Sequence, residues 1–158
     1  MLDLREEIIK SMRASPIILH QLVIGLDVEA SRRRPANGEW AVVEVVAHMV
    51  DVDRRAHARL RRMLAEEHPF LPAFDQEALA VERGYIDMVL AEQVAQYRRS
   101  RMDHVADLDA LDHEQWQRFG CHETQGDITV ELYEAHVASE DVDHLAQIAS
   151  ILARSGSE

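Results

Sequence analysis

The sequence predicts an all-α protein, a single domain over residues 1–158 whose helices form a four-helix bundle. Residues of high helix propensity dominate, whereas glycine and proline number only six and four. Apolar side chains recur at helical spacing in four long segments. No segment shows convincing strand alternation, and no internal repeat or low-complexity segment is present. The middle connectors are longer than an antiparallel bundle requires, which predicts at least one long crossover connection.

The first predicted helix covers residues 3–26, where Leu4, Ile8, Met12 and Leu19 fall at helical spacing. Proline lacks the backbone N–H that a helix interior uses, so Ser15-Pro16 predicts a kink or a restart. Residues 27–38 are expected to form a connector, because they end in a proline, an asparagine and a glycine typical of turns.

The second predicted helix covers residues 40–64, and its segment 41–50 is apolar almost all round. Such a pattern indicates a helix segment buried on every side. Pro69 and Pro72 end this helix and begin a loop. One polar line runs along it, formed by Glu44, His48, Asp51 and Arg55.

The third helix is predicted over residues 76–105, with Gly84 as a weak point. Residues 107–126 look irregular, with one short turn near 114–119 and a loop over 120–126. Asp127 is the predicted cap of the fourth helix, which extends to about Arg154.

The fourth helix carries a carboxylate and an imidazole one turn apart on its apolar stripe. Tyr133, Val137 and Ile148 share that stripe with Glu140 and His144. A buried carboxylate is costly unless it is paired or bound to a metal. Residues at i and i+4 are neighbours, so this pair could hold a cation together with a ligand from another helix. A plain buried ion pair is the alternative.

The composition opposes several functional classes. A net charge of −12 argues against nucleic-acid partners, which need a basic surface. The sequence has no run of about 18 uncharged apolar residues, so no membrane span is expected. The N-terminus lacks the apolar core of a signal peptide. The single cysteine, Cys121, excludes an internal disulfide, and we expect a cytoplasmic protein with Cys121 passive in a loop.

An ordered set of short motifs spans most of the chain and resembles the DinB/YfiT-like superfamily. The matching residues are Arg34-Pro35, Gly38-Glu39-Trp40, Glu44 to His48, Phe74-Asp75, Tyr85, Arg98, Arg101, Gly126, Ile128-Thr129 and His144 to Ile148. The resemblance implies a four-helix bundle with a divalent metal held by three histidines, one from the second helix and two at i and i+4 on the fourth. His48 matches the first position and His144 the last.

The middle ligand position falls on Glu140, where the family pattern has histidine. A set of two imidazoles and one carboxylate remains a metal site, with Zn or Ni favoured and Fe or Mn as further candidates. Around it we expect Glu44, His136 and Gln147 to support the ligands and His122 to line the mouth of the cavity. The alternatives are a hydrogen-bonded core histidine at His48 and a surface loop histidine at His122.

Five further histidines match no constellation and are expected at the surface: His20, His57, His68, His104 and His113. The resemblance implies a metal-dependent enzyme acting on a small molecule, either an S-transferase or an isomerase that uses a low-molecular-weight thiol, and a homodimer. A hydrolase-like reaction is a further expectation, because a bound metal can activate water. The alternative is a non-catalytic bundle with a degenerate metal site, acting through oligomerisation or stress-related binding.

Overall fold

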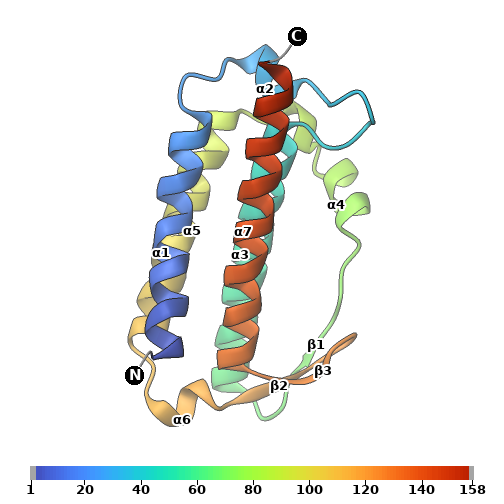
Figure 1. Cartoon of the computed structure of the whole chain (residues 1–158). Helices are drawn as coiled ribbons and strands as arrows, with labels where there is room; N and C mark the ends of the chain where they lie inside the picture. The colour runs from blue at the N-terminus through green and yellow to red at the C-terminus, as the bar shows by residue number, and fades with distance from the viewer. Residues whose placement is uncertain (1–2, 157–158) are drawn as a thin grey trace.

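Four long helices form the body of the protein in the computed structural model, which describes residues 3–156 (Figure 1). They are α1 (Leu4–Val23), α3 (Val42–Ala65), α5 (Leu90–Asp109) and α7 (Val130–Ser155). Helix α1 packs mainly on α5 and α7, and α3 packs on the same two helices. The predicted four-helix bundle is therefore confirmed, with α1 and α3 at opposite corners.

The predicted crossover lies between α3 and α5. Figure 1 shows α3 and α5 running in the same direction, so residues 66–89 must return along the length of the bundle. This return carries β1 (Phe70–Leu71), α4 (Gln76–Glu82) and the 3₁₀ turn η1 (Tyr85–Asp87). The prediction of one helix over residues 76–105 was wrong, because Gly84 adopts a left-handed conformation, with φ of 62°, that ends α4.

Helix α1 continues through Pro16 without the predicted break. Proline at this position leaves the carbonyl of Met12, four residues earlier, without its helical donor. The buried Arg101 guanidinium donates to that carbonyl oxygen at 3.3 Å. The hydroxyl of Ser15 donates to the Ser11 carbonyl oxygen at 3.1 Å. Neighbouring side chains thus satisfy the backbone groups that the proline disturbs.

The two remaining connections lie at opposite ends of the bundle, and only one of them contains strands (Figure 1). Helix α2 (Val28–Arg32) links α1 to α3. Helix α6 (His113–Trp116) and strands β2 (Phe119–His122) and β3 (Gly126–Thr129) link α5 to α7. Strand β2 pairs in parallel with β1 and antiparallel with β3.

The sequence predicted no strands and predicted Asp127 as the cap of the fourth helix, and both predictions were wrong. Residues 120–126 belong to a hairpin whose turn uses Gly126, with φ of 72°. Thr129, not Asp127, caps α7 by accepting a hydrogen bond from the Leu132 N–H at 3.2 Å. Only β1 and β2 come from distant segments, whereas β2 and β3 form a local hairpin. Strands of two to four residues are too short for alternation to reveal them.

A layer of buried polar residues divides the apolar core into two parts. Each long helix contributes at least one such residue between the two apolar clusters, among them Ser15, Asp53, Arg101 and Asp141. The Nε of Arg101 donates to Asp53 at 2.7 Å, and its Nη2 donates to Asp141 at 3.0 Å. The charge of this arginine is thus balanced by carboxylates from two other helices.

His104 and His57 belong to the same interior, which corrects their predicted place at the surface. His104 is fully buried, with its Nδ1 3.0 Å from Asp53 and its Nε2 3.1 Å from Glu134. His57 is also buried, stacks on His104 with ring centroids 4.8 Å apart, and lies 2.6 Å from the Asp107 carboxylate.

Within residues 3–156, no helix combines the length and the apolar character needed to cross a bilayer.

Candidate metal centre

His48 and His144 come together because α3 and α7 pack side by side. Their rings meet edge to face, with centroids 4.7 Å apart and planes at 76°. Each ring sits within a regular stretch of a long helix, so the backbone fixes the positions of both side chains. The predicted pairing of these two histidines across the bundle is therefore seen in the structure.

The His48 imidazole is buried and lacks a hydrogen-bond partner at one nitrogen. The residue is 1% exposed, and among the described residues nothing pairs with its Nδ1. The Trp40 ring packs against it with centroids 5.1 Å apart. Burial, and then the nearby His144, lower the pKa of His48 to about 4. This imidazole is neutral near pH 7 and keeps a nitrogen lone pair, as a metal ligand requires.

The His144 imidazole also has one nitrogen free of hydrogen bonds. Its Nε2 is buried without a hydrogen-bond partner in residues 3–156, while its Nδ1 lies 3.3 Å from the Gln147 carbonyl oxygen Oε1. When Nδ1 carries the hydrogen, it donates to Gln147 and leaves the Nε2 lone pair free. The predicted contact of Gln147 with a ligand histidine is present.

Glu140 lies at the edge of this pair and not inside it. Its carboxylate is 3.8 Å from His144 Nε2 and 3.8 Å from His136 Nε2, and its side chain is 41% exposed. The prediction of a buried face at Glu140 was therefore wrong, because the buried stripe of α7 runs through Val137, Asp141 and Leu145 and Glu140 lies at its edge. The donor atoms of His48, Glu140 and His144 do not all lie within 4.8 Å of one another. In the described chain, one group of three potential ligands has that spacing: His68, Cys121 and Asp127.

Three further predicted residues hold different positions. Glu44 accepts hydrogen bonds from the Ala41 N–H at 2.8 Å and from Arg34 at 2.6 Å, so it fixes the start of α3. His136 is exposed, and its Nε2 lies 3.8 Å from the Glu140 carboxylate. His122 lies on β2, half-buried, where burial followed by Arg59 and His136 lowers its pKa.

The crossover between α3 and α5 supplies a polar wall beside the histidines that sequence reasoning missed. Asp51 accepts a hydrogen bond from the Tyr85 hydroxyl at 2.6 Å and pairs with Arg83 at 3.3 Å. Burial and Asp51 together raise the pKa of Tyr85. The Arg55 guanidinium lies 3.8 Å from the Phe74 ring centroid. Spacing on α3 did reveal the polar line, but its partners come from a distant segment.

Comparisons with known proteins agree with this architecture. The family model described as the DinB superfamily matches residues 13–148. An Oceanobacillus iheyensis protein named "Putative metal-dependent hydrolase OB0413" is 28% identical over 131 residues, covering 82% of this chain and 75% of that protein. Another from the same organism, "Putative metal-dependent hydrolase OB0782", is 28% identical over 151 residues, covering 94% of this chain and 86% of that protein.

A solved structure shares the fold. YfiT from Bacillus subtilis, described as "a probable metal-dependent hydrolase with an unusual four-helix bundle topology", superimposes with a TM-score of 0.90 at 23% identity. The match covers 96% of this chain and 87% of that one. At this identity the likeness establishes the bundle and its connection order.

Proposed function

Since this chain belongs to the DinB superfamily, we propose that it is a divalent-metal-dependent enzyme whose metal ligands are His48, Glu140 and His144. One observation carries the proposal. Two buried imidazole nitrogens, from helices α3 and α7, lack hydrogen-bond partners within the described chain while their rings are 4.7 Å apart. The metal-dependent names of the relatives support the same reading.

The residues present fit a divalent cation. An unpaired buried polar atom costs about 1–3 kcal/mol, and a cation between the rings would satisfy both nitrogens. Glu140, already 3.8 Å from His144, needs only a change of side-chain torsions to contribute an oxygen. Two nitrogens and one oxygen suit Zn or Ni, and also Fe or Mn.

A divalent ion held by three protein ligands would keep an open position, lower the pKa of a bound water or thiol, and polarise a carbonyl. The protein side chains prepare the site for that chemistry. His48 stays neutral because it is buried beside His144. Gln147 orients the His144 ring, and Trp40 packs on His48 and keeps water from that side.

The substrate we propose is a small molecule, and the attacking nucleophile is water or a low-molecular-weight thiol. The hydrolase names of the relatives support water. The family resemblance of the motifs around His48 and His144 supports a thiol, through S-transfer or isomerisation. The two reactions need the same ligand set, so they differ in which nucleophile occupies the open position.

A non-catalytic bundle is the second candidate, and the position of Glu140 favours it. Its carboxylate is shared between His136 and His144 and is 41% exposed. A weak pair of this kind could persist without any metal, and such a protein would act through oligomerisation or stress-related binding.

Elemental analysis of protein purified without a metal-affinity tag tests the proposal. We expect bound Zn, Ni, Fe or Mn, of which His48→Ala loses one equivalent per chain and His20→Asn, a substitution at an exposed histidine, loses none. The metal-loaded protein is then assayed on activated esters and amides with and without a small thiol. Wild-type protein that binds none of these metals, even after titration, would leave the non-catalytic bundle.

A further inference from the structure

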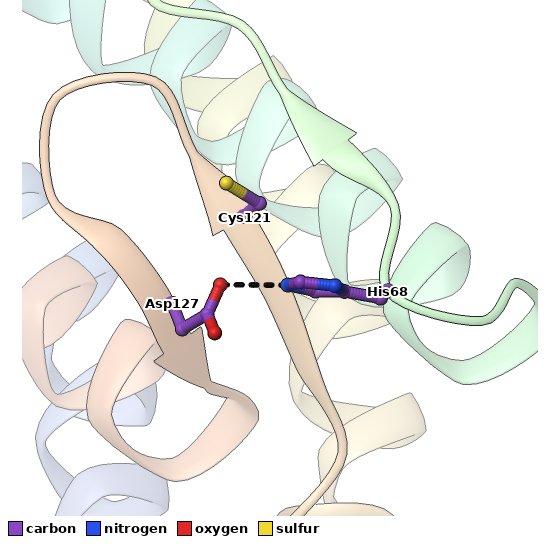
Figure 2. Close-up of side chains that lie close together, drawn as sticks. All are labelled: His68, Cys121 and Asp127. Atoms are coloured by element: carbon purple, nitrogen blue, oxygen red, sulfur yellow. Dashed lines mark hydrogen bonds and ion pairs between the residues drawn. The ribbon is translucent and has the colours of Figure 1, made fainter.

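A second group of metal-ligating side chains lies on the small sheet at the end of the bundle where α7 begins (Figure 1). His68, Cys121 and Asp127 each offer one ligand atom, and these atoms lie within 4.8 Å of one another. Figure 2 shows three side chains close together from the loop after α3, strand β2 and strand β3: the His68 imidazole faces the Asp127 carboxylate, and the Cys121 thiol lies beside them. None of the three belongs to the His48–His144 centre.

Sheet register brings these residues to one face. Cys121 is directly opposite Asp127 in the antiparallel pair, so their side chains point to the same side. On its other edge Cys121 is opposite Phe70, and His68 lies two residues before Phe70. The Cys121 N–H donates to the Pro69 carbonyl oxygen at 2.9 Å, which holds the His68 segment against β2.

The His68 backbone adopts a conformation that needs an explanation. Its φ of 49° makes it the one non-glycine residue with positive φ in the described chain. This left-handed conformation costs roughly 1–2 kcal/mol for a residue with a Cβ. Two contacts hold the ring in place: its Nε2 is 2.6 Å from Asp127 Oδ1, and the Phe119 ring packs at 4.8 Å. The strain therefore delivers an imidazole to the Cys121–Asp127 pair.

We propose that His68, Cys121 and Asp127 bind one Zn²⁺. Thiolate sulfur, imidazole nitrogen and carboxylate oxygen are all zinc ligands, and the thiolate disfavours hard cations such as Mg²⁺. One thiolate and one carboxylate balance the two positive charges. The side chains of His68 and Asp127 are 46% and 63% exposed, so water can take the fourth position.

The ligand atoms would have to move by about 1 Å, since their separations now run from 2.6 Å up to at most 4.8 Å. Zinc bonds of about 2.0–2.3 Å place the donors of one tetrahedron about 3.3–3.8 Å apart. The cation would replace the hydrogen shared by His68 and Asp127, and their present 2.6 Å separation would widen by less than about 1 Å. The bound ion would join the loop after α3 to the hairpin that leads into α7.

Cobalt titration of the reduced full-length protein tests this site, because Co²⁺ bound to a thiolate shows charge-transfer absorption in the near ultraviolet. The His48–His144 centre contains no sulfur, so this band reports Cys121 alone. We expect one equivalent of Co²⁺ per chain to produce the band and Zn²⁺ to abolish it. The band should persist in His48→Ala, whatever that variant does to the proposed enzyme centre.

Four variants complete the experiment. Cys121→Ser should remove the band, and His68→Asn and Asp127→Asn should each weaken binding about 10-fold or more, as loss of a ligand does. Asparagine tolerates positive φ, so His68→Asn keeps the backbone, and circular dichroism checks the fold of every variant. His20→Asn is the matched control and should bind normally. A missing band, unchanged affinity without His68 and Asp127, or one cobalt shared between two chains would overturn the proposal.

Discussion

The imidazole rings of His48 on α3 and His144 on α7 meet edge to face with centroids 4.7 Å apart. Neither His48 Nδ1 nor His144 Nε2 has a hydrogen-bond partner in residues 3–156. A structural histidine in a core usually pairs both nitrogens, as His104 does with Asp53 and Glu134. This difference between two kinds of buried histidine is the physical basis for assigning a metal to one of them.

Replacing either histidine of the pair should weaken metal binding at this centre. His144→Ala and His48→Ala each remove one of three ligands, and we expect the affinity for Zn or Ni to fall at least 10-fold. His144→Ala loses the weak hydrogen bond to Gln147 at 3.3 Å. Because His48 is 1% exposed and packs on Trp40, His48→Ala also leaves a cavity and lowers the free energy of unfolding. Isothermal titration calorimetry measures the affinity, with His113→Asn as control. Unchanged binding in both variants would contradict the ligand assignment.

Glu140 variants test the middle ligand. Glu140→His should restore the three-histidine set that the family resemblance implies and keep or tighten binding of Zn or Ni, because imidazole suits these metals better than carboxylate. Glu140→Ala should weaken binding about 10-fold. The half-exposed side chain makes only 3.8 Å ion pairs, so Glu140→Ala should change the free energy of unfolding by less than about 1 kcal/mol. Calorimetry on both variants decides whether Glu140 contributes, and equal affinities in wild type and Glu140→Ala would remove it from the site.

Stability should fall as pH rises from about 6.5 to about 9. Burial alone lowers the pKa of His104, but Glu134 and Asp53 outweigh it and raise the pKa to about 9. The unfolded chain loses this proton near its ordinary value of 6.5, so over this interval the folded state binds more protons. The contribution, about 3 kcal/mol at most, is fully present below pH 6.5 and lost above pH 9.

Urea unfolding across this pH range measures the change, and an NMR titration of the His104 ring gives the pKa directly. Asp53 acts at the acidic end: burial opposes its charge, yet His104 and Arg101 lower its pKa to about 2. Its stabilising effect should therefore be fully present above its ordinary pKa of 3.8 and be lost as pH falls from there to about 2. An NMR pKa for His104 near 6.5 would contradict the buried charge layer.

The homodimer remains a prediction, and the groove between α1 and α5 is where we would test it. Ile17, Ile24 and Met102 line that groove with side chains at least 60% exposed. If a second copy covers them, Met102→Glu should shift the protein toward the monomer, because a charge would be buried in the contact. Sedimentation measures the mass against 18.0 kDa for one chain. A wild-type protein that stays at that mass at high concentration is a monomer.

Local sequence determined the helices and part of the site. Apolar spacing marked the four long segments, and the i, i+4 relation of Glu140 and His144 follows from helix geometry alone. The motifs around His48 and His144 indicated the family, and the long connectors predicted the crossover. These features depend on residues close in the chain or on order along it, so no knowledge of the packing was needed.

Tertiary structure decided which polar groups are paired. The sequence placed His57 and His104 at the surface and Glu140 on a buried face, and all three were corrected by the packing of neighbouring helices. Arg101 donates to the Met12 carbonyl that Pro16 leaves without its helical donor, and β1 adds a distant partner to β2. Burial and hydrogen bonding are properties of contacts between segments, and periodicity within one segment shows only which side of it faces inward.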